Sequence, residues 1–150
     1  MPTKFNGNIR EVRALNAYIC LYRATESINH RICKDFKQDG FTPSQFSLLE
    51  CLYHHGPMSP TILAIKTMRT CGNMTFVLDK LENKDWLQRK VNPKERRSYT
   101  IYLLEKGKKM VEKWLPIYVN NIVVEMNSLN KKEQETLRYL SRTIGLGTKS

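Results

Sequence analysis

The chain has 150 residues, of which 41% are hydrophobic, so it can bury a core as one domain or as one domain with extensions. Lys and Arg number 25 against 14 Asp and Glu, which gives a formal net charge of +11. This excess favours a polyanionic partner, namely DNA, RNA or an anionic membrane surface. No apolar run approaches the ~20 residues of a membrane span, and residues 1–6 lack the apolar core of a secretory signal.

The cysteine pattern indicates the redox environment. The four cysteines are widely separated, form no Cys-x-x-Cys motif and lie in apolar or helix-like stretches. This pattern favours reduced thiols in a cytoplasmic protein over a disulfide framework. A zinc site needs His, Cys and carboxylate ligands at close spacing, and the neighbours His54 and His55 do not supply that set. We therefore expect a cytoplasmic protein with no metal and no cofactor.

Two predicted helices open the chain. The first spans residues 8–37, where apolar residues recur at three- and four-residue steps, and Gly40 ends it as a C-cap. The second begins after Thr42, a capping residue followed by proline in the first turn, and it stops at Gly56. The apolar positions of these two helices are Val12, Leu15, Ile19, Tyr22, Ile28, Ile32, Phe36, Phe46, Leu49 and Leu52.

Two further helices and a hairpin follow. Ser59 and Pro60 predict the start of a short helix over residues 61–67, and a fourth helix is predicted over residues 71–84. The period then changes to that of strands over residues 86–91 and 98–103. Between the strands, residues 92–97 form a proline-marked, highly charged loop. The apolar stripe of the fourth helix consists of Met74, Val77, Leu78 and Leu81.

Two helices close the chain. The first starts at Glu105 and is expected to bend or break near Pro116, and the second runs from about Lys131 to Gly145. The whole order predicts a mostly α (α+β) fold, a winged helix-turn-helix with long terminal helices. We expect a DNA-binding module over residues 42–104 and dimerisation helices over residues 8–38 and 105–147 of the single chain 1–150. The terminal helices are too long to pack fully on the module, so a second copy of the chain is the expected partner.

The fourth helix carries the candidate base-reading residues. In a helix-turn-helix the second helix enters the major groove, with its N-terminal residues at the base edges. An Asn side chain can read adenine, the methyl group of Thr or a Phe ring can contact the thymine methyl, and Gly72 permits close approach. The alternative is an ordinary polar face of an amphipathic helix. The candidates are Thr70, Gly72, Asn73, Thr75, Phe76 and Lys80.

The charged loop between the strands is the second candidate DNA contact. An arginine on a thin loop can enter the minor groove, where the negative potential is strongest, and Glu95 is a candidate to orient one guanidinium through a bidentate pair. The alternative is a solvated charged turn. The wing candidates are Lys94, Glu95, Arg96 and Arg97. The candidates for phosphate contacts, which give register and salt dependence, are Lys66, Arg69 and Arg89.

The stretch from Phe41 to Gly107 resembles the bacterial MarR family of transcription regulators. The most specific pieces are Cys-Gly-Asn-Met-Thr at 71–75, the run from Leu78 to Arg89 and the wing piece Asn-Pro-Lys-Glu-Arg-Arg at 92–97. The resemblance implies a triangular homodimer with interlocked terminal helices, in which two winged modules read a palindromic operator. It also implies a wing arginine in the minor groove.

Residue by residue, the resemblance places this wing arginine at Arg97, and Glu95 stands where the family usually has an orienting Asp. Two positions depart from the family pattern. Asp85 replaces a common Gly before the wing strand, where Asp tolerates a left-handed backbone, and Leu104 replaces a Thr that usually caps the next helix. Neither position faces the groove, so the expected DNA binding is unaffected.

The resemblance also implies a signal that releases the DNA. Relatives often bind phenolic or other small aromatic ligands in a crevice between the dimer helices and the winged module. Other relatives use a reactive cysteine in the first helix, although the spacing of Cys20 to Gln45 does not match the peroxide-sensing group well. The aromatic residues also fit an ordinary core. The candidates for an effector or redox site are Tyr18, Cys20, Tyr22, His30 and His54.

The function expected from all these features is a sequence-specific double-stranded DNA-binding regulator, a repressor acting as a homodimer. An enzyme is not expected, because the chain has no Gly-x-Ser-x-Gly, phosphate-binding glycine loop or His-Glu-x-x-His motif. The open alternative is a winged-helix module for protein or RNA contacts. Such a module would bind DNA weakly and without sequence preference, whereas a regulator discriminates its site by ~10³–10⁷.

Overall fold

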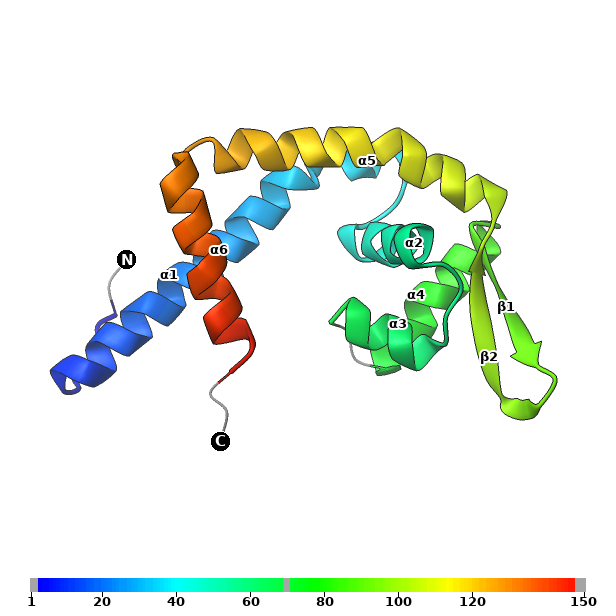
Figure 1. Cartoon of the computed structure of the whole chain (residues 1–150), viewed down its shortest axis with the longest axis horizontal. Helices are drawn as coiled ribbons and strands as arrows, with labels where there is room; N and C mark the ends of the chain where they lie inside the picture. The colour runs from blue at the N-terminus through cyan, green and yellow to red at the C-terminus, as the bar shows by residue number, and fades with distance from the viewer. Residues whose placement is uncertain (1–2, 69–70, 148–150) are drawn as a thin grey trace. The chain divides into compact units, whose positions relative to one another are not determined.

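The computed structural model describes residues 3–68 and 71–147, and of Cys71, Gly72 and Arg96 it describes the backbone only. The chain forms two compact units, one of residues Cys33–Tyr118 and one of Met1–Ile32 with Val119–Ser150. Figure 1 shows the elements, which are α1 (Ile9–Ile32), a 3-10 helix η1 (Lys34–Asp39), α2 (Pro43–His55), α3 (Pro60–Lys66), α4 (Cys71–Asn83), β1 (Leu87–Asn92), β2 (Glu95–Leu103), α5 (Glu105–Met126) and α6 (Lys131–Gly145).

This element order confirms the predicted mostly α class with one two-stranded antiparallel sheet. In the described part of the chain, no helix combines the length and the apolar character needed to cross a membrane. The predicted breaks at Gly40 and Gly56 are both present. Each glycine has a positive φ, 69° and 78°, a backbone conformation that side chains with a Cβ disfavour.

The first helix is shorter than predicted. Residues 8–37 were expected to form one α-helix, but α1 ends at Ile32 and the chain winds into η1. The reason is the packing of Phe36, which is only 2% exposed and whose ring centroid lies 4.7 Å from those of both Phe41 and Phe46. The tighter 3-10 turn directs this ring into the core of the Cys33–Tyr118 unit. Burial of the aromatic cluster outweighs the local apolar periodicity.

The α2 and α3 helices begin at the predicted caps. The Thr42 hydroxyl accepts from the Gln45 amide, the Gln45 side chain accepts from the Thr42 amide, and Pro43 occupies the first helical position. The Ser59 hydroxyl accepts from the Ile62 amide at 3.3 Å. Because these caps satisfy backbone groups locally, both helices start where the sequence indicates.

One hydrophobic core holds the Cys33–Tyr118 unit together. The predicted stripe of α4 faces it, and its members are at most 7% exposed. The Trp114 indole is 3% exposed, and its Nε1–H donates to the Asp39 carboxylate at 2.6 Å, so the buried donor has a partner. The other fully buried side chains of this core include Phe36, Leu48, Leu49, Leu63, Leu87, Ile101 and Val111.

The hairpin, or wing, is tighter than predicted. The loop was expected over residues 92–97, but β2 already begins at Glu95, so the turn contains only Pro93 and Lys94. Val91 pairs with Tyr99 and Asn92 pairs with Glu95, so residues 96–98 are extra on β2 and form a bulge. The Asn92 side chain accepts from the Lys94 amide at 3.0 Å, a local bond that stabilises the tight turn.

The connection from α4 to β1 is a Schellman turn. The Trp86 amide donates to the Leu81 carbonyl and the Asp85 amide to the Glu82 carbonyl, at 3.1 and 2.9 Å. Asp85 has φ 57°, a left-handed conformation that Asp tolerates, at the position where the family usually has Gly. The turn places Trp86, 5% exposed, in the core directly after the helix ends.

Gly107 permits a close approach of α5 to this connection. A Cβ at Gly107 would lie 2.1 Å from the Trp86 carbonyl oxygen, and the same carbonyl accepts from the Leu104 amide at 3.0 Å. Since the obstacle is backbone, it has no side-chain rotamer to move aside. Gly107 therefore allows the start of α5 to pack against the connection that leads from α4 into the wing.

The second unit contains little core of its own. Among its described residues only Ile32 is buried. The bond from Asn121 Nδ2 to the Ile32 carbonyl at 3.0 Å and the Arg31–Glu125 ion pair at 2.7 Å join α1 to the end of α5. The helix α5 is continuous through Pro116, where a bend or a break was expected. Exposed apolar side chains of this unit include Ile9, Tyr18, Leu21, Tyr22, Val119, Val123, Val124, Leu137, Leu140 and Ile144.

Replacing Gly107 by Ala should destabilise the chain by about 1–3 kcal/mol, the usual cost of overpacking, because the new methyl group collides with the Trp86 backbone. Urea unfolding followed by circular dichroism measures the change. Gly145→Ala is the control, since a Cβ there meets nothing within 4 Å. Equal stabilities of the two variants would contradict the close approach.

Candidate nucleic-acid interface

The face of α4 opposite its buried stripe carries the predicted base-reading residues. The side chains of Asn73, Thr75, Phe76 and Lys80 are all exposed. The position of Gly72 lies in the first turn of the same helix, and Thr70 lies outside the described residues. The burial of the stripe on one side therefore leaves the four described candidates on the solvent side, as the 3.6-residue period predicts.

A cavity of about 300 Å³ joins this helix to the wing. It is lined by residues from the start of α3, from α4 and from β2. Thr75 and Arg97 both line it, so two predicted DNA contacts from separate elements share one concave surface. The described residues that line it are Ser59, Pro60, Thr61, Met74, Thr75, Arg97, Ser98 and Tyr99.

The bulge of β2 determines where the wing charges lie. Lys94 occupies the turn, and Arg97 is exposed inside the bulge, where bulges redirect side chains relative to a regular strand. The Glu95 carboxylate accepts from the Ser98 hydroxyl at 3.1 Å, a bond that spans the bulge. The side chain of Arg96 is outside the described part of the structure. The hairpin thus places Arg97 at the cavity and Lys94 in the turn at its tip.

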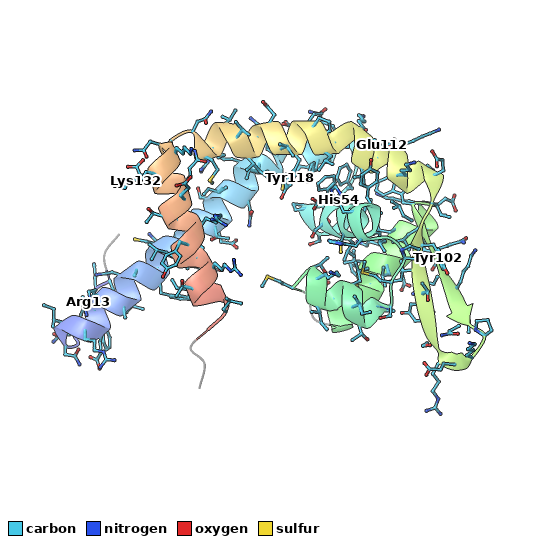
Figure 2. The ribbon with its side chains drawn as sticks, viewed as in Figure 1. Arg13, His54, Tyr102, Glu112, Tyr118 and Lys132 are labelled. Atoms are coloured by element: carbon cyan, nitrogen blue, oxygen red, sulfur yellow. The ribbon has the colours of Figure 1, made fainter. Side chains whose placement is uncertain are left out.

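The paired strands carry further cations beside tyrosine rings. The ammonium group of Lys90 lies 5.0 Å from the ring centroid of Tyr102, on the neighbouring strand (Figure 2). The guanidinium of Arg89 lies 5.8 Å from the ring centroid of Tyr99. Such contacts support the long cationic side chains while leaving their charge in place.

Arg89, predicted to contact phosphate, is instead held by two carboxylates of α4. Its Nε donates to Glu82 Oε2 at 2.7 Å, its Nη2 donates to Asp79 Oδ1 at 2.6 Å, and its Nη2 also pairs with Glu82. Its backbone amide donates to Glu82 Oε1 at 3.0 Å. Arg89 therefore links the first strand of the wing to the base-reading helix.

The electrostatics of this link favour the ionised forms. The hydrogen bond that Arg89 donates to the Glu82 carboxylate is the main cause that raises the pKa of Arg89 above its ordinary value. Partial burial opposes ionisation of Glu82, but the hydrogen bonds and the charge of Arg89 outweigh it and lower the pKa of Glu82 below 4.5. The link is therefore intact at neutral pH.

Lys66 lies at a different hollow from Thr75 and Arg97. It lines a cavity of about 280 Å³ between α2 and α3 together with His54 (Figure 2), and Arg69 lies outside the described residues. His54 Nε2 is 3.8 Å from Glu50 Oε1. Desolvation is the main cause that raises the pKa of Cys51 in this cavity. Among the described residues, no group of three or more His, Cys, Asp or Glu is arranged to hold a metal ion.

The other effector candidates lie in the second unit, on α1. Tyr18 and Tyr22 are 63% and 57% exposed, and their rings stack with centroids 6.3 Å apart. Cys20 and His30 are also exposed on this helix. These four residues therefore share one helix, whereas His54 belongs to the Cys33–Tyr118 unit.

Three features of the interface were not predicted from the sequence. They are the carboxylate partners of Arg89, the contribution of Ser59 and Thr61 to the cavity, and the need for Gly107 behind the wing. The sequence holds a signal for the first: Asp79 and Glu82 lie three residues apart, which places both on one face of a helix. That spacing indicates a shared partner but does not identify Arg89.

Comparison with known proteins gives consistent matches along most of the chain. A model described as the MarR family matches residues 41–99. The chain is 34% identical over 134 residues to the uncharacterized HTH-type transcriptional regulator YkoM of Bacillus subtilis, covering 89% of this chain and 87% of that protein. It is 32% identical over 137 residues to the HTH-type transcriptional regulator MhqR of the same organism, covering 91% and 94%.

Similar architecture occurs among solved structures. MepR of S. aureus in its DNA complex matches with a TM-score of 0.75 and 25% sequence identity, over 81% of this chain and 91% of that chain. The matched region includes most of the chain rather than the winged module alone. The similarity therefore extends beyond the winged module into the flanking helices.

Glu82→Gln should lower the free energy of unfolding by about 1 kcal/mol at neutral pH, because Arg89 loses a charged partner. Folding lowers the pKa of Glu82, so its contribution is complete above its ordinary value of 4.5 and is lost as the pH falls through the lower folded-state value. Urea unfolding at several pH values should show the stabilities of the variant and the wild type converging as the pH falls through that lower folded-state pKa. Glu26→Gln, an exposed change on α1, is the control, and a pH-independent gap for Glu82→Gln would contradict the link.

Proposed function

Since the chain belongs to the MarR family of HTH-type transcription regulators, which are not enzymes, we propose that it binds a palindromic operator in double-stranded DNA as a homodimer. The observation that carries this proposal is the cavity shared by Thr75 of α4 and Arg97 of the wing. A helix and a hairpin that meet in this way can engage adjacent grooves of one duplex. The DNA complex of the similar protein MepR supports the proposal.

Each proposed contact has a separate role. Asn73, exposed in the first turns of α4, reads a base edge in the major groove, and adenine is the base that fits its side chain. Arg97 enters the minor groove beside it. Lys94 at the wing tip and Lys66 on α3 contact phosphates, which gives affinity and salt dependence without sequence information. Arg89 is a positioning residue, since its guanidinium is already paired with Asp79 and Glu82.

The homodimer is proposed from the second unit. Its described residues bury only Ile32, while apolar side chains of α1, α5 and α6 are exposed. The apolar face of α6 includes Leu137, Leu140 and Ile144, which recur at helical spacing. A second copy supplies a matching surface by symmetry, and two winged modules then match the two halves of a palindrome.

Release of the operator is proposed to depend on a signal received on α1. The stacked Tyr18 and Tyr22 rings offer an aromatic surface to a small aromatic effector. Cys20, which lies between them in the sequence, is exposed and so is accessible to an oxidant. Because α1 belongs to the unit proposed to dimerise, a ligand or a modification there can change the separation of the two winged modules.

Selection of bound sites from random duplex DNA, followed by titration of the best palindrome, tests the DNA contacts. Arg97→Ala should weaken operator binding about tenfold or more with the fold intact, because a minor-groove cation is lost. Asn73→Ala should instead reduce the discrimination among operator variants more than the affinity for random duplex.

Arg142→Ala on α6 is the matched control for loss of one exposed arginine, and it should leave the affinity nearly unchanged. If Arg97→Ala also leaves the affinity unchanged, the wing assignment is wrong. If Asn73→Ala weakens all sequences equally, Asn73 does not read bases. A chain that selects no palindrome is instead a winged-helix module for protein or RNA contacts.

Sedimentation equilibrium at micromolar concentration should give twice the 17.6 kDa of one chain. Leu140→Glu should shift the mass towards one chain and abolish operator binding, because it buries an unpaired charge in the proposed interface. Arg142→Glu, which places a carboxylate on the opposite side of α6, should leave the dimer in place. If the wild-type chain is a monomer, the proposed mechanism with two half-sites is wrong.

A further inference from the structure

Phe76 is the exposed aromatic residue of α4. Its side chain is 60% exposed, whereas its neighbours Met74, Val77 and Leu78 are buried. Among the described side chains of this helix, it is the only large apolar one exposed to solvent. The core therefore does not require an aromatic residue at this position, and the exposed ring lies on the face that carries Asn73.

Lys80, one helical turn later, holds the ring of Phe76 in place. The ammonium nitrogen of Lys80 lies 4.2 Å from the ring centroid, a cation–π contact between residues i and i+4 of a helix. The contact restricts the ring and adds a positive charge beside it. The pair therefore presents a fixed apolar surface in a position that suits the negative potential of DNA.

The structure also separates Phe76 from Thr75, the other residue of this face that can offer a methyl contact. Thr75 lines the cavity that it shares with Arg97, and Phe76 is not among the residues that line it. Successive residues of an α-helix point about 100° apart, so the two side chains face different surroundings. Phe76 is the one whose exposed apolar surface lies outside that cavity.

The chemistry of the major groove then identifies what Phe76 can read. A phenyl ring neither donates nor accepts a conventional hydrogen bond, and the C5-methyl of thymine is the distinctive apolar group on the base edges there. We propose, resting on the function proposed above, that Phe76 contacts the C5-methyl group of one thymine in each half-site and that Lys80 is its positioning residue. Phe76 is then a specificity-determining residue for a thymine at that position.

Replacing thymines by deoxyuridine, one symmetric pair at a time, in the selected operator tests this contact, because only the methyl group is removed. One position should lose affinity by about fourfold per half-site, the value of one buried methyl group. For Phe76→Ala this uracil penalty should disappear, so that the thymine and uracil operators bind equally. Thr75→Ala should keep the penalty at that position, whatever its overall affinity.

The outcomes separate the two proposals. If the wild-type protein selects a palindrome but shows no uracil penalty, the role of Phe76 is wrong and the regulator function stands. The same holds if the uracil penalty survives in Phe76→Ala. A penalty that Thr75→Ala removes also overturns the role of Phe76, because the methyl contact then belongs to Thr75. A wild-type chain that binds random duplex as tightly as any selected site overturns the regulator function together with this inference. Circular dichroism of Phe76→Ala is the control that checks whether the variant retains the fold.

Discussion

The link between Arg89 and the carboxylates of Asp79 and Glu82 is the interaction on which the arrangement of the interface depends. Arg89 lies on β1, and both carboxylates lie on the helix that carries the base-reading face. The antiparallel pairing of β1 with β2 extends this constraint to Arg97. The Schellman turn at Asp85 shortens the connection between helix and strand to a few residues. The helix and the wing are therefore held in one relative position before any DNA is bound, which reduces the ordering required on binding.

The core explains why the exposed face of α4 is free to carry chemistry. Met74, Val77, Leu78 and Leu81 account for the packing of the helix, so the exposed Asn73, Thr75 and Phe76 are not required by the core. Gly107 allows α5 to pack against the turn that connects α4 to β1. The aromatic cluster around Phe36 belongs to the same hydrophobic core. In the proposed function, the net charge of +11 attracts the chain to a polyanion in general, and the few exposed groups of α4 select the sequence. Affinity and specificity would then arise from different residues.

The second unit gives the proposed function its symmetry. Its described helices are joined by a few polar bonds, such as Arg31 with Glu125, and not by a core of their own. In the proposed homodimer, another copy of the chain covers these apolar faces, and duplication of the winged module follows from that contact. A signal that alters this unit would then act on DNA binding without contacting the proposed base-reading face of α4. The exposed residues of α1 are placed where such a signal can reach them.

Local patterns in the sequence determined the elements that depend on near neighbours. Caps at Thr42 and Ser59 and the stripe of α4 were predicted, because each rests on periodicity or on backbone preferences within a few residues. Other features appeared only in the tertiary structure. The early end of α1, the bulge that carries Arg97 and the pairing of Arg89 with α4 depend on residues that are distant in sequence or on strand register. The sequence shows that an arginine is present, but it does not show whether its guanidinium contacts a phosphate or a carboxylate. Only the packing of helix against strand decides which partner lies within hydrogen-bonding distance.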